Sequence, residues 1–292
     1  MDVLDYRKVE SDRRQSAGGE PASEERHVIS GSNPDTRDRN PVTHLLACFQ
    51  DDPSKETWAY ADYLCSLLHS QITFIDLPAA RTAPWIKFRM SDCDLIVFEE
   101  PKQSFNERLL AGQEGHRAVS QAPVSMLLTR RPRWPIKTIL MITRTEETDE
   151  AALEWVGRLA RPSGATVTIL PVLCSFPSVY TPACSKETAL GEILSPNTQP
   201  GRQLRDLCQQ LTQWQITASL RLRQGEPEWQ LRWEIAKGDY DLIVIGADPF
   251  RRWRRWLVGE LVASMLRWAN RPLLIARPTQ KVQYSSGVID RD

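Results

Sequence analysis

Apolar residues form two kinds of run along most of the chain. Short, wholly apolar runs such as 242–245 are rich in β-branched residues and predict strands covered on both faces. In longer runs such as 261–268, apolar residues recur every three or four positions, which predicts amphipathic helices. The two kinds alternate after about residue 42, with Gly and Pro between them. This order predicts an α/β fold, in which helices cover both faces of a doubly wound parallel sheet.

The expected elements fall into two series. The first series has strands at 43–49, 72–75, 94–98 and 124–128, a helix that Ser54 is suited to cap, and a short helix at 84–90. The second has strands at 137–143, 166–172, 216–222, 242–245 and 273–276, with helices around 152–160, 202–214, 229–236 and 261–268. In the helix at 229–236, Trp229, Trp233 and Ala236 are expected to form the apolar stripe.

The sequence Asp-Leu-Ile-Val occurs twice, at Asp94 and at Asp241. In both places a shared glycine follows after 18 residues, at Gly112 and at Gly259, and a proline and an apolar strand come later. This indicates an internal duplication. The two copies differ in length, because about 50 residues separate the first strand from the motif in the first copy and about 100 in the second. The first copy therefore lacks roughly one strand-plus-helix unit.

These observations divide the chain into four segments. Residues 1–40 contain no Trp or Phe and are rich in charged residues, Ser, Gly and Pro, so we expect a disordered polar tail. The first copy then covers 41–131 and the second 132–278, and a short tail follows at 279–292.

Composition limits the classes of function. The chain has 292 residues and a net charge of zero, which gives no general case for nucleic-acid binding. Its six cysteines match no metal motif, and we interpret them as reduced. No apolar run approaches the roughly 20 residues of a membrane span, and no signal peptide is apparent, so we expect a cytoplasmic protein. The four histidines are scattered and no catalytic motif is present, so we expect no enzyme and no bound metal.

The second copy resembles a universal stress protein domain. That family's hallmark is G-x2-G-x9-G followed by Ser or Thr, between a strand and a helix. Here the frame reads Gly246, Ala247, Asp248, Pro249, nine residues, Gly259 and Glu260, so the spacing is kept and two of four signature positions are changed. Residues 42–278 are thus similar to a tandem universal stress protein with a shortened first copy.

The resemblance implies an architecture. Each copy would form a doubly wound parallel sheet of the adenine-nucleotide-hydrolase-like type, with strand order 3-2-1-4-5 in the second copy and without an edge unit in the first. Family members pair through their last strands. The segments 124–129 and 273–277 would therefore meet across an internal pseudo-two-fold, giving a pseudo-dimer within one chain; a further homodimer is left open.

Members that bind ATP place its phosphates on the glycine loop and the following helix start, where free N–H groups favour an anion. Pro249 removes one such donor, Glu260 stands in the hydroxyl position, and Arg144 stands where the resemblance implies an acidic residue. A carboxylate about 4 Å from a phosphate costs about 4 kcal/mol at an effective dielectric near 20. We therefore expect no ATP or other cofactor, and interpret Gly246 and Gly259 as structural.

In the first copy, Glu99, Glu100 and Pro101 replace the glycine loop. The expected function is a non-catalytic regulatory or scaffold role in a stress response, with a protein partner that the sequence does not identify. One alternative is a regulatory protein that binds ATP or another nucleotide through the loop after Ile245. Another is an adaptor for anions, nucleic acid or a membrane surface through 251–255, where Arg251 and Arg144 would hold an anion.

Overall fold

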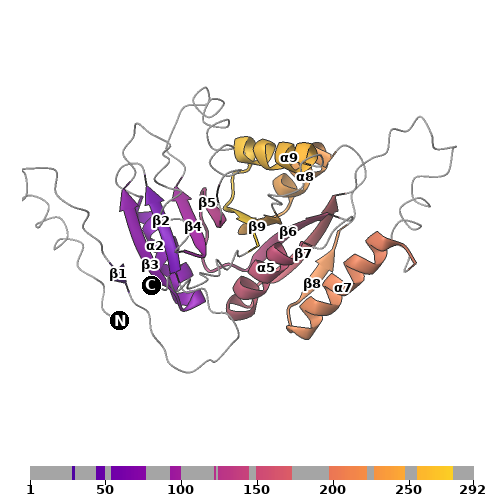
Figure 1. Cartoon of the computed structure of the whole chain (residues 1–292), viewed down its shortest axis with the longest axis horizontal. Helices are drawn as coiled ribbons and strands as arrows, with labels where there is room; N and C mark the ends of the chain where they lie inside the picture. The colour runs from indigo at the N-terminus through magenta and orange to yellow at the C-terminus, as the bar shows by residue number, and fades with distance from the viewer. Residues whose placement is uncertain are drawn as a thin grey trace, which may run out of the picture.

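The computed structural model describes residues 28–29, 44–49, 54–76, 93–99, 122, 124–144, 149–172, 197–221, 227–246 and 255–278. Their strands form one sheet of ten strands in the order β1-β3-β2-β4-β5-β10-β9-β6-β7-β8 (Figure 1). The first half of the chain builds one side of this sheet and the second half builds the other.

The first half has a parallel sheet with one helix against it. Its elements are β1 (Val28–Ile29), β2 (His44–Phe49), α2 (Lys55–Leu68), β3 (Gln71–Asp76), β4 (Leu95–Glu99) and β5 (Ser125–Thr129). β2 lies parallel to β3 and β4, and β4 lies parallel to β5. Ser54 caps α2 as expected, since its hydroxyl accepts a hydrogen bond from the Thr57 N–H at 3.2 Å. The short helix expected at 84–90 lies outside the described residues.

The second half contains all nine of its predicted elements. They are β6 (Thr138–Arg144), α5 (Glu150–Ser163), β7 (Thr166–Val172), α7 (Gln199–Gln213), β8 (Ala218–Leu220), α8 (Pro227–Lys237), β9 (Leu242–Gly246), α9 (Arg255–Trp268) and β10 (Leu273–Ala276). Their strands are all parallel and lie in the order β8-β7-β6-β9-β10. Counted along the chain from β6, this is the order 3-2-1-4-5.

The two halves meet where β5 pairs antiparallel with β10, with Leu128 opposite Leu273 and Met126 opposite Ile275. The predicted meeting of the last strands is therefore confirmed. It also corrects the expectation of two sheets, because this pairing makes them one. Ser125 fixes the joint: its Oγ accepts hydrogen bonds from the Trp155 indole N–H at 2.8 Å and from the Arg277 N–H at 3.0 Å.

Apolar residues pack on both faces of the sheet, as the continuous apolar strands predict. In β9, Val244 faces a cluster that includes residues of α2, α5 and α7. Its neighbours Ile243 and Ile245 face the opposite cluster, which includes residues of α8 and α9 (Figure 1). Successive side chains of this strand therefore pack against helices on opposite faces of the sheet, as a doubly wound fold requires. Of the helices in the described part of the chain, none combines the length and apolar character that crossing a membrane requires.

The outer edge of the first half differs from the prediction. Val28 and Ile29 form a short strand that pairs antiparallel with β3, opposite Thr73 and Ile72. They occupy the edge that the missing strand-plus-helix unit leaves open, where β3 would otherwise present unpaired N–H and C=O groups. The prediction of disorder for 1–40 is therefore wrong at these two residues, and the remainder of that segment lies outside the described residues.

Helix α8 buries a different face from the predicted one. Trp229 is 61 % exposed and Trp233 is 37 % exposed, whereas Leu231 and Ile235 are buried. The reason is Glu234, which is fully buried between them on the same face. Its Oε1 accepts hydrogen bonds from the Tyr240 hydroxyl at 2.6 Å and from Arg221 Nη1 at 2.9 Å. A charged residue thus turns inward because the fold supplies its partners.

Candidate functional site

The first candidate site is the edge of the sheet at which β6 and β9 end. These neighbouring strands run parallel, with Ile142 opposite Ile245. β6 leads into α5 on one face and β9 leads into α9 on the other. Open α/β sheets bind ligands at such a switch point, where the carboxyl ends of two strands part toward opposite faces.

The structure brings two of the four predicted site residues to this edge. Gly246 is the last residue of β9 and Arg144 the last of β6, so they end adjacent strands. Gly259 lies inside α9, which begins at Arg255, rather than opening that helix as expected. No Gly or Pro interrupts residues 255–258, which explains the earlier start. Arg251 lies outside the described residues.

Sequence reasoning missed the residue that faces Gly246. Asp149, the N-cap residue of α5, is only 6 % exposed. A methyl carbon added to Gly246 would lie 2.7 Å from its Oδ1 and 3.0 Å from its Cγ. Gly246 is therefore needed at this position because it leaves room for the Asp149 carboxylate. An acidic residue does reach this edge, although Arg144 stands in the position where one was expected.

The first half also has a carboxylate at the corresponding edge. Glu99 is the last residue of β4, and its two carboxylate oxygens accept from the N–H of Ser54 at 3.1 Å and 3.4 Å. Ser54 is the N-cap residue of α2. The sequence showed Glu99 only as a replacement for a glycine, whereas the structure shows which group it binds.

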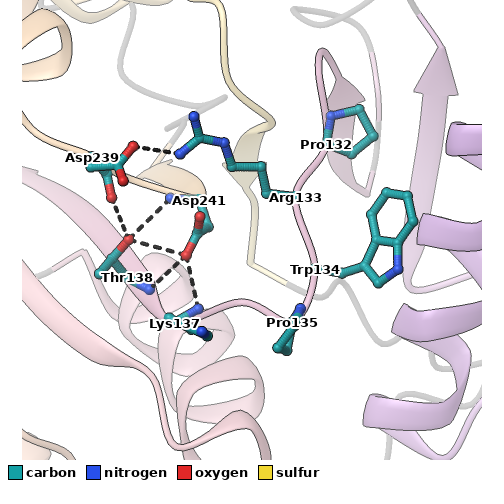
Figure 2. A pocket seen from close by; sticks show the side chains of 8 residues that line it. All are labelled: Pro132, Arg133, Trp134, Pro135, Lys137, Thr138, Asp239 and Asp241. Atoms are coloured by element: carbon teal, nitrogen blue, oxygen red, sulfur yellow. Dashed lines mark hydrogen bonds and ion pairs between the residues drawn. The ribbon is translucent and has the colours of Figure 1, made fainter.

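A second candidate is a hollow of about 500 Å³ at the opposite, amino ends of β6 and β9 (Figure 2). It is lined by Pro132, Arg133, Trp134, Pro135, Lys137, Thr138, Asp239 and Asp241. Asp241 Oδ2 accepts from the N–H groups of Lys137 at 2.9 Å and Thr138 at 3.0 Å, and from the Thr138 hydroxyl at 3.1 Å. Asp239 forms an ion pair with Arg133 across the hollow. The two acidic residues that line the hollow, Asp239 and Asp241, thus bind other residues that line it.

The wall of this hollow includes the linker that joins the two halves. The Ile136 N–H donates to the hydroxyl of Tyr63 on α2 at 3.0 Å, and the Trp134 ring lies 6.3 Å from the ring of Tyr60 on the same helix. Through Arg133 and Asp239 the same linker is held to the second half (Figure 2). These contacts define the hollow as a structural joint.

The repeated Asp94 and Asp241 have the same role in the two halves. As Asp241 does for Thr138, the Asp94 carboxylate accepts from the N–H of His44, the first residue of β2, at 3.2 Å. In return, the N–H of each aspartate donates at 2.9 Å to the carbonyl of that first-strand residue. The duplicated motif therefore starts equivalent central strands, and its aspartate joins them at the amino ends.

The described residues offer little else for catalysis or metal binding. Within the ranges that the structure describes, no three His, Cys, Asp or Glu side chains come together as a metal site. Cys65, Cys93 and Cys208 are free thiols. Burial, helped by nearby Asp62, raises the pKa of the Cys65 thiol to about 12, which keeps it protonated and unreactive.

Fold and site together define a class: two α/β halves joined edge to edge by their last strands, of which the second is doubly wound and has a switch point at the carboxyl ends of its central strands. Residues 135–277 match the universal stress protein family. This range covers β6 to β10, and the second half of the chain is a universal stress protein domain.

Solved structures show the same fold over both halves. A protein from Pseudomonas aeruginosa UCBPP-PA14 described as a universal stress protein is 14% identical, with a TM-score of 0.54 over 82% of this chain and 94% of that one. A universal stress protein from Archaeoglobus fulgidus is 12% identical, with a TM-score of 0.52 over 81% and 86%. A third match extends over about half of the chain: a universal stress protein family protein from Arabidopsis thaliana with AMP bound is 15% identical, with a TM-score of 0.35 over 52% of this chain and 97% of that one. No curated protein matches the chain.

Proposed function

We propose that this chain is a non-catalytic regulatory or scaffold protein of the universal stress protein type, which acts in the cytoplasm without binding ATP. The observation that carries the proposal is Glu260, a carboxylate in the signature position where the resemblance implies a hydroxyl that contacts a phosphate. A phosphate brought about 4 Å from this carboxylate would lose about 4 kcal/mol at an effective dielectric near 20. That is roughly a thousandfold in affinity.

The sequence of the loop after β9 supports the same conclusion. Pro249 has no N–H to donate to a phosphate. This change and Glu260 both act against a bound phosphate. Two independent changes would therefore have to be overcome by a bound triphosphate.

A scaffold role fits the way in which the halves are joined. β5 and β10 pair inside one chain, and the linker is bonded to both halves by Tyr63 and Arg133. The β5–β10 pairing and the linker thus hold the two halves in a fixed relation to each other. A partner that contacts both halves would meet one preorganised surface, which lowers the entropic cost of binding.

Calorimetric titration and thermal unfolding of the full chain with Mg-ATP and with AMP test this proposal. We expect no heat of binding and no change in Tm. With about 1 mM ligand, a Kd of about 10 µM would stabilise the protein by about 2.7 kcal/mol and raise its Tm by several degrees. Such a rise would overturn the proposal and favour a nucleotide-binding regulator instead.

The adaptor alternative has its own test. Residues 251–254 lie outside the described part of the chain, so an anion, nucleic-acid or membrane role for this cluster stays a prediction from the sequence. Replacement of its arginines by serine should leave capture of protein partners unchanged if the scaffold proposal is right. Loss of binding to nucleic acid or anionic vesicles in that variant would favour the adaptor.

A further inference from the structure

We infer that the outer face of α8 is the surface by which this protein binds a partner, and that it takes a protein segment that is both apolar and acidic. The outer face is formed by five exposed residues: Trp229, Arg232, Trp233, Ala236 and Lys237. This inference rests on the proposed function, since it names the binding surface of the scaffold and the chemistry of its partner.

The outer face lies directly opposite the side of α8 that packs on the sheet. At about 3.6 residues per turn, the buried Leu231, Glu234 and Ile235 centre on one side of the helix, and the outer face centres on the other. Trp229 and Trp233 are four residues apart, so their side chains lie one turn apart along the same ridge. Two large rings are therefore presented side by side to solvent.

This aromatic ridge is the apolar stripe that the sequence predicted for the core. Four large apolar side chains are exposed in the described part of the chain, and the outer face carries two of them; the four are Trp134, Leu220, Trp229 and Trp233. α8 thus has apolar side chains on both faces, whereas a surface helix ordinarily has one apolar stripe. Neighbouring exposed apolar groups mark interaction sites, and Trp and Arg are enriched among the residues that dominate binding energy.

The charges on the outer face are all positive. Arg232 and Lys237 are both exposed, and none of the ion pairs in the described part of the chain involves either of them. The two acidic residues of α8 are turned away from this face. Glu234 is buried, and Glu228 accepts a hydrogen bond from Ser264 on α9 at 3.1 Å. A partner that packs on the two rings therefore gains by placing carboxylates beside them.

Contacts on its other sides hold α8 in this orientation. The buried Glu234 accepts a hydrogen bond from the Tyr240 hydroxyl at 2.6 Å, which fixes the rotation of the helix. Beside it, the Arg232 guanidinium lies 5.7 Å from the centre of the Trp268 ring on α9, and the two helices lie on the same face of the sheet (Figure 1). A face held in place before binding loses little entropy when the partner arrives.

The same features favour a protein segment over a nucleic acid or a membrane. Binding to nucleic acid draws on several phosphate contacts, about six to ten in well-studied cases, and the outer face has two cations. A helix that lies in a membrane surface carries its cations opposite its apolar face, whereas on α8 the cations and the rings share one face. Apolar side chains flanked by Asp or Glu match both features of the outer face.

Selection of peptides from a displayed library tests the inference. The bait is the full chain, the library holds random peptides about four helical turns long, and counter-selection uses the double variant Trp229→Ser, Trp233→Ser. We expect the enriched peptides to combine Leu, Ile or Phe with Asp or Glu. Made synthetically, they should bind wild type at least about thirtyfold more tightly than the double variant in calorimetry. Arg232→Glu should weaken them about tenfold at low salt and less at high salt.

Matched controls carry the same changes elsewhere on the surface. Trp134→Ser removes the exposed tryptophan of the linker, and Arg205→Glu reverses an exposed charge on α7; both should leave peptide binding unchanged. The double variant should keep the circular dichroism spectrum and Tm of wild type, because both rings are exposed. If it does not fold, Trp229→Ser and Arg232→Glu as single variants take its place in the selection.

The outcomes separate this inference from the proposed function. Enriched peptides that bind the double variant as well as wild type, or that are basic, would overturn the inference and leave the proposed function intact. Binding of phosphatidylserine vesicles by wild type and not by the double variant would overturn it in favour of a membrane surface. Stabilisation of wild type by Mg-ATP would overturn the proposed function, and the result of the peptide selection would still stand.

Discussion

Replacement of Asp241 by alanine should destabilise the protein more than any other change in the wall of the linker hollow. The residue is 8 % exposed, and its Oδ2 accepts from two backbone N–H groups and one hydroxyl at 2.9 to 3.1 Å. Those N–H groups belong to Lys137 and Thr138, at the start of the central strand β6. The alanine variant leaves both without this acceptor.

The size of the effect follows from the kind of hydrogen bond that is lost. A hydrogen bond to a charged group contributes about 1.5–3 kcal/mol, and a buried donor left without a partner costs a similar amount. Water in the hollow can reach part of this wall, so the losses do not add in full. We expect about 2–4 kcal/mol for Asp241→Ala, a fall in Tm of roughly 5–15 °C. Asp241→Asn keeps an acceptor oxygen and should lose about half as much.

Thermal and urea unfolding, followed by circular dichroism, measure this prediction. The matched control is Asp239→Ala in the same wall, because the Asp239 side chain is 82% exposed and its ion pairs with Arg133 and Arg271 should contribute less than about 1 kcal/mol. Asp94→Ala should destabilise the first half in the same direction. Equal losses of stability in Asp241→Ala and Asp239→Ala would refute the argument that the backbone N–H groups at the start of β6 determine the cost of removing Asp241.

Three further predictions concern the second half and the core. Gly157→Ala should lower the free energy of unfolding by about 1 kcal/mol, because the new methyl group would lie 2.7 Å from the rigid Trp214 ring. This loss is expected although alanine favours helices more than glycine does. A variant that is more stable in urea unfolding would contradict the prediction. Burial, then its hydrogen bond to a glutamate, raises the pKa of Tyr240 from 10.0 to about 12. The stabilisation from the raised pKa is complete below about pH 10 and is lost as the pH rises toward 12, so wild type should lose more stability than Tyr240→Phe between about pH 10 and about pH 12 in urea titrations. Iodoacetamide at about pH 8 should modify the half-exposed Cys208 before the buried Cys65, as peptide mapping by mass spectrometry would show; faster reaction of Cys65 would mean that the helix opens there.

Local patterns along the chain were sufficient to predict most of the fold. Continuous apolar strands such as β9 and β10 appear in the sequence because both of their faces are covered, and the structure confirms that layering. β1 could not be predicted in this way, since two residues in a polar segment have no periodicity and pair with a strand more than 40 residues later. The pairing arises because the edge of β3 is otherwise open, and not from any pattern in Val28–Ile29 themselves.

The buried face of α8 was mispredicted for a related reason. Hydrophobicity alone assigns Trp229 and Trp233 to the core and Glu234 to solvent. Hydrogen bonds from Tyr240 and Arg221, which lie outside the helix, help to offset the energetic cost of burying Glu234. The buried face of a helix that depends on such hydrogen bonds cannot be predicted from hydrophobicity alone.

The candidate site shows the same limit. The sequence identified Gly246 and Arg144 at the ends of adjacent strands, because strand ends can be located from periodicity. It did not identify Asp149, whose side chain reaches Gly246 from a helix cap nearly 100 residues earlier in the chain. The available signal was the duplication itself: Ser54 and Asp149 both precede the first helix of a copy, and alignment of these two positions would have placed an acid beside Gly246.

Carboxylates lie at both edges of this sheet, and three of them accept hydrogen bonds from backbone N–H groups there. Asp94 and Asp241 bind N–H groups at the amino ends of the central strands, while Glu99 and Asp149 lie at the carboxyl ends beside the helix starts. Backbone groups at strand and helix ends need partners wherever they are buried, and a bound ligand that supplied them would stabilise the folded state. Here the chain supplies acidic groups at the same ends. The N–H groups of His44, Ser54 and Lys137 thus have acceptors within the chain, and under the proposed function partner binding would not depend on nucleotide concentration.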